Sequence, residues 1–267
     1  MKIQMLERFL IFITLVLALA ACAQKENALQ VDENRVVVGI DPNYAPFEFQ
    51  CGDTAGPAGF DIDLMREIGR LNGWEVEFRE MPFERLITAL TGGEIDAVAS
   101  ALTITPKREA VVDFSDPYYL TGQSLVVLSG DSTIVDLADL RGQRVGVQQG
   151  TTGEDLARGI DGALIFRYHS IGEAFLHLAG GELDVVINDY PSTRLYLAEH
   201  DDLEIANPEV NAEYYGIAVR KNFPDRLQAI NEALAVLIGD GTYDSLHQKW
   251  FGYSWVEDLG PDLTDSL

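Results

Sequence analysis

Short apolar runs alternate with stretches of helical periodicity along most of the chain. Residues 35–41 (R-V-V-V-G-I-D) predict a buried strand, and residues 60–71 carry apolar positions at the spacing of a helix. Residues 75–81 alternate like a strand, residues 83–90 predict a short helix, and residues 97–101 predict the next strand. Strands that alternate with helices favour a mainly parallel sheet whose faces are covered by helices.

The same alternation restarts in the second half of the chain. Further strands are predicted at 124–128, 144–148, 164–168, 185–189 and 214–220. Further helices are predicted at 171–178, 224–238 and 242–250. We expect the last two helices to return to the first half, so that the chain crosses between two lobes near 119–123 and near 212–216. Two crossing segments allow hinge closure around a ligand.

An internal echo supports this division. Residues 90–98 read L-T-G-G-E-I-D-A-V, and residues 178–186 read L-A-G-G-E-L-D-V-V. Each copy follows a helical stretch and runs into an apolar strand, which indicates one supersecondary unit used twice. We interpret the shared turn as structural: its glycines end a helix and aim the next strand at a cleft between the lobes.

These patterns predict an α/β fold with two lobes, each built on a mainly parallel sheet. The first lobe is expected to comprise residues 35–120 and 215–255, and the second residues 121–214. An acidic tail follows at 256–267.

The N-terminus has the pattern of a targeting segment. Basic residues precede an apolar run at 9–21 that is too short to span a bilayer but suits a signal peptide. The run ends L-A-A-C at Cys22, which resembles the bacterial lipobox, in which the cysteine is acylated after cleavage. We therefore predict a signal peptide at 1–21 and a lipid anchor on Cys22, followed by a polar tether to residue 34. An ordinary signal peptide with an incidental cysteine is the alternative.

The composition excludes some classes of function. The net charge is −24, with 43 acidic and 19 basic residues, which disfavours nucleic acid as a partner. A solvated acidic surface explains this charge, and adaptation to high salt is an alternative. Only Cys51 accompanies Cys22, so an acylated Cys22 leaves no internal disulfide. The four histidines lack metal-ligand spacing and no G-x-S-x-G motif is present, so we expect no metal or cofactor and no enzymatic activity.

Candidate chemistry gathers at the carboxyl ends of the predicted strands, where α/β sheets bind their ligands. The first strand ends at Asp41, and the strand at 144–148 ends at Gln148. When the two echoes are aligned, Asn188 and Asp189 fall in register with Ser100 and Ala101. The two lobes therefore present different side chains at equivalent places, as a cleft for an asymmetric ligand requires.

Two further segments suit an anion. Thr103 precedes a Pro-containing turn and Arg108, whose guanidinium can bind a carboxylate through two hydrogen bonds. A surface salt bridge is the alternative for Arg108. Thr151 and Thr152 open a helix in the sequence G-T-T-G, where free backbone N–H groups attract an anion or form a plain N-cap.

Five motifs in order resemble the family 3 periplasmic solute-binding proteins of amino-acid ABC importers. They are V-V-G-I-D-P-N-Y-A-P-F-E-F (37–49), G-F-D-I-D-L (59–64), S-A-L-T-I-T-P-K-R (100–108), D-F-S-D-P-Y-Y (113–119) and G-T-T-G (150–153). The resemblance covers nearly all of the chain after the tether. It implies a two-lobed periplasmic-binding-protein fold of type II, a polar amino acid as ligand and an ABC permease as partner. It also implies a monomer in the cell envelope, held at the membrane by its lipid.

The resemblance also implies roles for matching residues. Arg108 pairs with the ligand α-carboxylate, helped by Thr103 and Thr152, while Asp189 takes the α-amine, helped by Ser100. Tyr44 and Phe83 sandwich the ligand side chain, and Asp41 reaches its polar end. The expected binding set is Asp41, Tyr44, Phe83, Ser100, Ala101, Thr103, Arg108, Gln148, Thr151, Thr152, Asn188 and Asp189.

Ligand preference is less sharply defined. The glutamine-binding proteins that the chain resembles carry Lys and His where Gln148 and Asn188 stand here, and some binders of cationic amino acids have Ser in place of Ala101. We favour glutamine, with an arginine-, lysine- or histidine-type ligand next. The alternatives are a dehydratase of the cyclohexadienyl type on the same fold, which needs a general acid in the cleft, and a ligand-sensing receptor domain.

Overall fold

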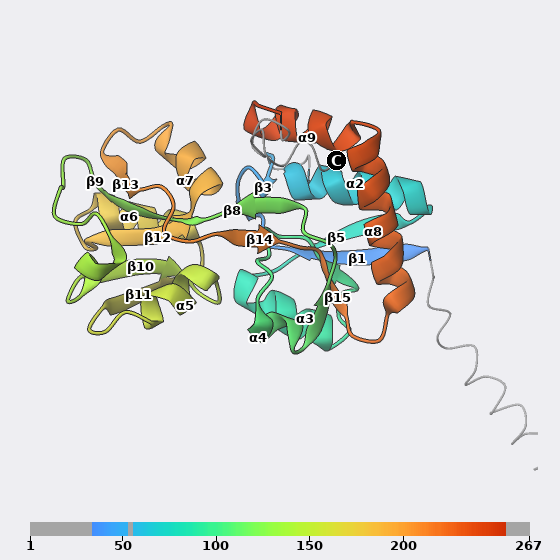
Figure 1. Cartoon of the computed structure of the whole chain (residues 1–267), viewed down its shortest axis with the longest axis horizontal. Coiled ribbons are helices and arrows are strands. Elements are labelled where there is room, and N and C mark those ends of the chain that lie inside the picture. The colour runs from blue at the N-terminus through green and yellow to red at the C-terminus, as the bar shows by residue number, and fades with distance from the viewer. Residues whose placement is uncertain (1–33, 53–55, 255–267) are drawn as a thin grey trace, which may run out of the picture. The chain divides into compact units, whose positions relative to one another are not determined.

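The computed structural model describes residues 34–52 and 56–254 (Figure 1). The predicted signal peptide, the predicted lipid anchor on Cys22, the predicted tether up to residue 33 and the acidic tail lie outside these residues.

The first lobe is built on a five-stranded sheet with the order β5-β1-β6-β15-β7. Its strands are β1 (Arg35–Ile40), β5 (Glu75–Glu80), β6 (Ala97–Val98), β7 (Val112–Phe114) and β15 (Ala218–Arg220). All of them run in one direction except β15, which is antiparallel to both neighbours.

Helices cover both faces of this sheet (Figure 1). They are α2 (Phe60–Asn72), a 3₁₀ turn (Phe83–Arg85) that leads into α3 (Leu86–Thr91), α4 (Pro106–Glu109), α8 (Pro224–Gly239) and α9 (Thr242–Phe251). Alternate residues of β1 point to opposite faces. Val36 and Val38 pack with residues of α2 and α8, whereas Val37 packs with Leu86 and Leu90 of α3.

The second lobe repeats this plan with the strand order β11-β10-β12-β9-β13. Its strands are β9 (Gln123–Leu128), β10 (Arg144–Gln148), β11 (Leu164–Tyr168), β12 (Val185–Asp189) and β13 (Leu203–Asn207). Its helices are a 3₁₀ turn (Leu137–Leu140), α5 (Thr152–Arg158), α6 (Ile171–Ala179) and α7 (Tyr190–Leu197). Here β9 alone runs against its neighbours. The predicted two-lobed, mainly parallel α/β fold is therefore confirmed.

Two short strands connect the lobes and pair with each other in antiparallel fashion (Figure 1). They are β8 (Tyr119–Thr121) and β14 (Glu213–Tyr215). The predicted continuous strand at 214–220 is wrong, because the chain breaks into β14 and β15 around Gly216. The N–H of Gly216 donates to the carbonyl of Leu102, and a Cβ at position 216 would come within 2.9 Å of Ile104.

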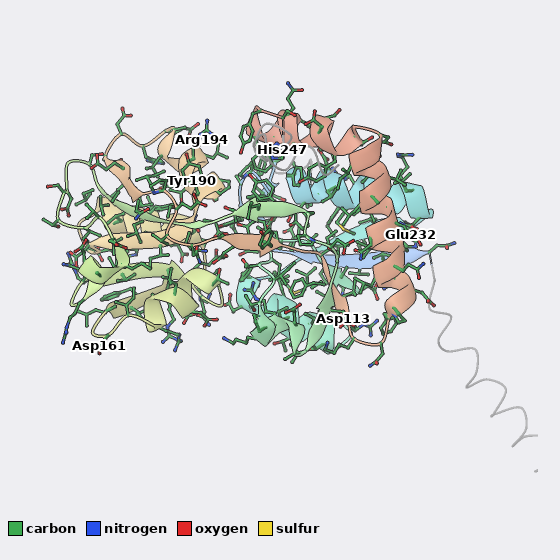
Figure 2. The ribbon with its side chains drawn as sticks, viewed as in Figure 1. Asp113, Asp161, Tyr190, Arg194, Glu232 and His247 are labelled. Carbon is green, nitrogen blue, oxygen red and sulfur yellow. The ribbon has the colours of Figure 1, made fainter. Side chains whose placement is uncertain are left out.

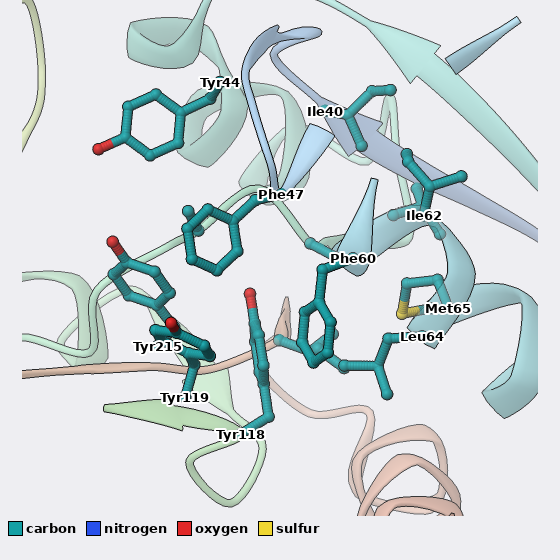
Figure 3. Close-up of a cluster of buried hydrophobic side chains, with 14 of the residues drawn as sticks. Ile40, Tyr44, Phe47, Phe60, Ile62, Leu64, Met65, Tyr118, Tyr119 and Tyr215 are labelled. Atoms are coloured by element: carbon teal, nitrogen blue, oxygen red, sulfur yellow. The ribbon is translucent and has the colours of Figure 1, made fainter. Parts of the chain in front are cut away.

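Aromatic side chains tie the crossing strands to the first lobe (Figure 3). Phe47 lies edge-on to Tyr119 and to Tyr215, with ring centroids 5.0 and 5.3 Å apart. Phe47 lies between β2 (Asn43–Tyr44) and β3 (Glu48–Gln50). These two strands form a small sheet with β4 (Pro57–Ala58). Edge-to-face contacts of this kind add to the stabilisation from burial.

The echoed turn has the same structure in both lobes. Gly93 and Gly181 follow the ends of α3 and α6 and have φ values of 77° and 72°. This left-handed conformation favours glycine because a Cβ would be strained there. The interpretation of the echo as a structural turn that ends a helix is therefore confirmed.

Candidate functional site

All the predicted site residues except Asn188 line one small cavity between the lobes. These are Asp41, Tyr44, Phe83, Ser100, Ala101, Thr103, Arg108, Gln148, Thr151, Thr152 and Asp189. Asn188 lies beside them, because its Oδ1 accepts a hydrogen bond of 3.0 Å from the Tyr44 hydroxyl. The cavity measures about 20 Å³, which is room for one water molecule.

The strand ends bring these side chains together. Asp41 follows β1 and Ser100 follows β6 in the first lobe, while Gln148 and Asp189 end β10 and β12 in the second. These four strands are parallel within their sheets, so their carboxyl ends meet at the edge that faces the other lobe. The predicted strand at 97–101 is shorter and ends at Val98, because only Ala97 and Val98 pair with the neighbouring strands, and Ala101 beyond them adopts a φ of 44°.

Buried carboxyls fix the loop that carries Ser100 and Ala101. The Ser100 hydroxyl donates to Glu48 Oε1 at 2.7 Å, and the Ala101 N–H donates to Asp61 Oδ2 at 2.7 Å. Burial raises the pKa of Asp61 to about 7 and raises the pKa of Glu48 well above its ordinary value. The hydroxyl proton of Ser100 is therefore directed at Glu48 behind the cavity, so Ser100 could help to bind the ligand amine only as an acceptor, and this role stays a prediction.

Arg108 extends from α4 toward the second lobe. Its Nη1 donates to the carbonyl of Thr103 at 2.7 Å, and its Nη2 donates to the carbonyl of Gly150 at 3.1 Å. Its Cζ lies 5.5 Å from the ring centroid of Phe83, a cation–π distance. Burial lowers the pKa of Arg108, while the charges of Glu213 and Asp189 act in the opposite direction. A guanidinium has five N–H donors, so this arrangement leaves donors for a carboxylate.

Asp189 presents a carboxylate from the second lobe. It accepts hydrogen bonds from the Gln123 amide and from the Tyr215 hydroxyl. Burial raises the pKa of Asp189 to about 7, with a further contribution from the charge of Glu213, and the bond from Tyr215 opposes the shift. A cation placed beside this carboxylate would favour its ionised form.

Asp41 and Gln148 meet across the cleft. Gln148 Nε2 donates to Asp41 Oδ2 at 2.8 Å, and Asn43 Nδ2 donates to Asp41 Oδ1 at 2.8 Å. Burial raises the pKa of Asp41, and these two hydrogen bonds oppose the shift. The Asp41 carboxylate thus marks one end of the cavity, where it faces the second lobe.

A second cavity of about 360 Å³ adjoins the first at Asp41. Its lining includes Glu80, Glu173 and His169. Glu84 lies close by: its Oε1 pairs with His169 Nδ1 at 3.1 Å, whereas its Oε2 is buried without a hydrogen-bond partner among the described residues. This end of the site is therefore rich in carboxylates.

The segment at 150–153 was predicted either to bind an anion or to form a plain N-cap. Thr151 is the N-cap of α5, because its hydroxyl accepts from the N–H of Glu154 at 3.3 Å. Gly150 has a φ of 82°, and a Cβ there would lie 3.1 Å from the backbone of Glu84 in the other lobe. Capping is therefore observed, and a role in anion binding stays a prediction.

The sequence analysis missed the acidic residues Glu84 and Glu213 of the site, together with Glu80 and Glu173 of the neighbouring cavity. Glu84 follows the predicted aromatic Phe83, and Glu213 lies on the crossing strand β14. Glu213 Oε2 accepts hydrogen bonds of 2.8 Å from both Thr103 and Thr152. The only signal in the sequence was their position, since Glu84 is next to Phe83 and Glu213 lies in the predicted crossing segment 212–216. Nothing else in the sequence distinguishes these two residues from the many exposed carboxylates.

The described residues contain no group of three or more His, Cys, Asp and Glu side chains arranged to hold a metal ion. Cys51 is exposed and forms no disulfide within the ranges 34–52 and 56–254. No helix in the described part of the chain has both the length and the apolar character required to cross a membrane.

Residues 36–253 match the family model of the bacterial extracellular solute-binding proteins, family 3. The chain is 32% identical over 240 residues to the arginine-binding extracellular protein ArtP of Bacillus subtilis, covering 88% of this chain and 92% of that protein. It is 33% identical over 241 residues to a probable histidine-binding protein of Campylobacter jejuni, with coverages of 88% and 93%.

Solved structures give a similar result. An ancestral arginine-binding protein bound to arginine is 39% identical and superposes with a TM-score of 0.79, covering 82% of this chain and 99% of that one. An ancestral arginine-binding protein is also known bound to glutamine, with a TM-score of 0.78 at the same identity and coverages. An ancestral amino acid-binding protein described as a precursor of cyclohexadienyl dehydratase is 36% identical, with coverages of 82% and 96% and a TM-score of 0.76.

Proposed function

Because the chain belongs to the bacterial extracellular solute-binding proteins of family 3, we propose that it binds one polar L-amino acid between its two lobes. The observation that carries this proposal is the meeting of Arg108 and Asp189 in one cavity from opposite lobes. A zwitterion enclosed in a cleft needs a partner for each of its charges, since an unpaired buried charge is strongly unfavourable. Arg108 and Asp189 provide one partner of each sign.

The surrounding groups complete this arrangement. The hydroxyls of Thr103 and Thr152 lie in the same cavity as Arg108 and would add donors to the α-carboxylate. Tyr44 and Phe83 line the cavity as well and offer apolar surface to the stem of the ligand side chain. Asp41 lies where the far end of that side chain would arrive.

The acidic end of the site shifts our proposed ligand from glutamine toward arginine. Asp41 lies at this end with the buried Oε2 of Glu84, which has no hydrogen-bond partner in the described part of the chain, and the neighbouring cavity adds Glu80 and Glu173. A guanidinium has five donors and a positive charge, so it would neutralise carboxylates that an amide cannot. Glutamine remains the second candidate because Gln148 already places a side-chain amide against Asp41.

Entry of an amino acid requires the lobes to separate, because a cavity of about 20 Å³ admits no more than a water molecule. The contacts to be broken join side chains of opposite lobes. Gln148 donates to Asp41, Tyr44 donates to Asn188, and Lys107 pairs with Asp155 at 3.1 Å. The paired crossing strands β8 and β14 are the elements about which such an opening would occur.

Calorimetry on the chain from Ala23 onward tests the proposal with each of the twenty amino acids. We expect micromolar or tighter binding of L-arginine. The variant Asp41→Asn keeps the size of the side chain and removes its charge, so it should weaken arginine far more than glutamine. An absence of heat with all twenty would reject amino-acid binding. Tight glutamine binding that Asp41→Asn leaves unchanged would instead restore glutamine as the ligand.

We further propose that the chain delivers its ligand to an ABC permease from the outer side of a membrane, held there by a lipid on Cys22. Labelling with a radioactive fatty acid tests the anchor. Label is expected on the wild type and should disappear in Cys22→Ala. The monomeric state remains a prediction that light scattering can test.

Elimination of water from a bound carboxylic acid is the second candidate function. The observation in its favour is Asp189, whose pKa of about 7 would allow it to donate a proton in the cleft. Incubation with prephenate or arogenate distinguishes the two, because only the enzyme forms a product. We expect no product.

A further inference from the structure

Glu213 is a buried carboxylate on the crossing strand β14, and it joins the two lobes. Its Oε2 accepts one hydrogen bond from Thr103 in the first lobe and another from Thr152 in the second, each 2.8 Å long. Its Oε1 accepts a bond of 2.9 Å from the amide of Asn211. The residue is only 5% exposed, so its carboxylate depends on these three donors in place of water.

The two hydroxyls that contact Glu213 are the ones proposed to bind the ligand α-carboxylate. A threonine hydroxyl has one proton to donate. The Thr103 and Thr152 hydroxyls therefore cannot hold Glu213 and the ligand carboxylate at the same time with a single linear hydrogen bond each. Glu213 also lies near enough to Arg108 and Asp189 for its charge to act on both.

We propose that Glu213 competes with the ligand carboxylate for two hydrogen bonds. Glu213 accepts these bonds from the hydroxyls of Thr103 and Thr152, and a bound amino acid must redirect both hydroxyls to its own carboxylate. This inference rests on the proposed function, since it assumes an amino acid in the cleft. Glu213 thereby sets the affinity below what Arg108 and the two hydroxyls would otherwise provide.

The position of Glu213 on β14 gives the competition a structural consequence. β14 pairs with β8, and these strands connect the lobes. When the two hydroxyls turn to the ligand, the side chain of Glu213 loses its hydrogen bonds to Thr103 and Thr152, while the backbone bridge between Tyr215 of β14 and Thr103 stays in place. Ligand binding in the cleft is therefore coupled to the crossing strand β14 through two hydrogen bonds, without a contact between the ligand and β14.

The variant Glu213→Gln tests this competition. The side-chain amide keeps the shape of the carboxylate, can donate to the threonine oxygens and leaves the hydroxyl protons for the ligand. It also removes a negative charge beside the site of the ligand carboxylate. Calorimetry should show L-arginine and L-glutamine binding about tenfold tighter than to the wild type, the equivalent of about 1.4 kcal/mol. Glu213→Asp keeps the charge on a shorter arm that cannot reach both hydroxyls, and it should give a smaller gain.

Primary amides of the same amino acids separate competition from a change in folding. L-argininamide and L-glutaminamide carry a neutral carboxamide in place of the α-carboxylate, which accepts more weakly from the two hydroxyls, so Glu213→Gln should improve their binding less than that of the amino acids. Glu232→Gln makes the same chemical change at an exposed position on α8 (Figure 2) and should alter neither affinity.

The outcomes of these measurements are distinct. A wild type that binds none of the twenty amino acids rejects the proposed function. A wild type that binds an amino acid, with Glu213→Gln and Glu213→Asp binding it equally or more weakly, rejects the competition and leaves the proposed function standing. An equal gain for the amino acid and its amide also rejects it. If Glu213→Gln fails to fold, Glu213→Asp alone decides between these results, and failure of both variants to fold overturns the inference in favour of a purely structural role.

Discussion

The two lobes contain the same turn but carry different residues after it. In the first lobe, the N–H of Asp96 donates to the carbonyl of Val37 and its Oδ2 accepts from the N–H of Val37 at 3.0 Å. In the second, Asp184 makes the same two bonds to Arg144, the second of them 2.7 Å long. The repeated aspartate thus fixes the register between the strand after the turn and its parallel neighbour.

Packing repeats along with the hydrogen bonds. A Cβ at Gly39 on β1 would lie 2.4 Å from Ile95, and a Cβ at Gly146 on β10 would lie 2.4 Å from Leu183. Gly39 and Gly146 each lie two residues after the strand residue that is hydrogen-bonded to the repeated aspartate. Ile95 and Leu183 each come directly before that aspartate in the sequence. The echo therefore extends beyond the motif itself into the strand beside it.

The equivalent strand ends then carry different chemistry. Counted from the repeated aspartates, Ser100 and Ala101 correspond to Asn188 and Asp189. Ala101 turns the chain away in a left-handed conformation, and Arg108 follows on α4. Asp189 leads directly into α7 and keeps its carboxylate in the cavity. The shared turn sets where side chains are presented, and the residues after it give one lobe a cation and the other an anion.

Removing the cation should have the largest effect. Arg108→Ala is expected to lower the affinity for an amino acid by about 2–5 kcal/mol, because it leaves the ligand carboxylate buried without its partner. Calorimetry with L-arginine and L-glutamine measures the loss. Arg194→Ala, at an exposed position on α7 (Figure 2), is the matched control and should bind as the wild type does. Unchanged affinity in Arg108→Ala would contradict the proposal that Arg108 of the first lobe binds the ligand carboxylate.

The sequence is sufficient to predict most of the fold and the composition of the cavity. The periodic patterns place most strands of the two main sheets and the longer helices, because the apolar positions that bury each face recur at regular spacing. They gave no prediction for the strands β7 and β13 or for the helices α4 and α7. The strand ends and the resemblance bring together the residues around Asp41 and Arg108. The functions of the individual residues remain predictions.

The features that escape the sequence depend on long-range contacts. The break at Gly216 accompanies a bond from its own N–H to Leu102, more than a hundred positions earlier in the chain. Glu213 and Glu84 gain their significance from partners in other elements, Thr152 and His169 among them. A local pattern carries no record of such partners, so an acidic residue in the cleft looks like any other in a chain of net charge −24.

The anion of the second lobe should make binding depend on pH. The pKa of Asp189 is raised to about 7, and the ammonium group of a ligand requires its ionised form. Below pH 7 binding must first remove a proton, so the affinity should fall as the pH decreases, approaching tenfold per pH unit. Calorimetry between pH 5 and pH 8 measures this slope. Asp189→Asn should bind more weakly throughout and lose the slope, whereas a flat profile in the wild type would contradict the assignment.

The repeated aspartates provide a comparison of stability. Asp96 accepts from the backbone and pairs with Arg226 at 3.0 Å and Arg220 at 3.3 Å, whereas Asp184 pairs with Arg144 alone among the described residues. The side chain of Arg226 is only 15% exposed. Asp96→Ala should therefore reduce the free energy of unfolding by about 2–3 kcal/mol and Asp184→Ala by about 1–2 kcal/mol, because each leaves polar groups without partners.

Denaturant unfolding followed by circular dichroism measures both losses. The variants Asp96→Asn and Asp184→Asn keep an oxygen for the backbone N–H and remove the charge, so each should recover part of the loss. Equal losses for the two alanine variants would show that the backbone bond alone accounts for the role of the aspartate, and that the arginines of the first lobe add nothing.

The smallest expected effect separates the conformation of the echoed turn from its contacts. Gly181 has a left-handed φ of 72° and open space where a Cβ would stand, so Gly181→Ala should lose only the conformational contribution, about 1 kcal/mol. Gly93→Ala adds a Cβ 2.9 Å from Arg220 Nη1, an arginine that also holds Asp96, and should lose slightly more. Gly172→Ala is the control: it lies within α6 with open space around it and should be neutral or stabilising. If Gly181→Ala were equally neutral, the glycine of the echo would not be required by the turn, and the repeated structure would depend on the aspartates alone.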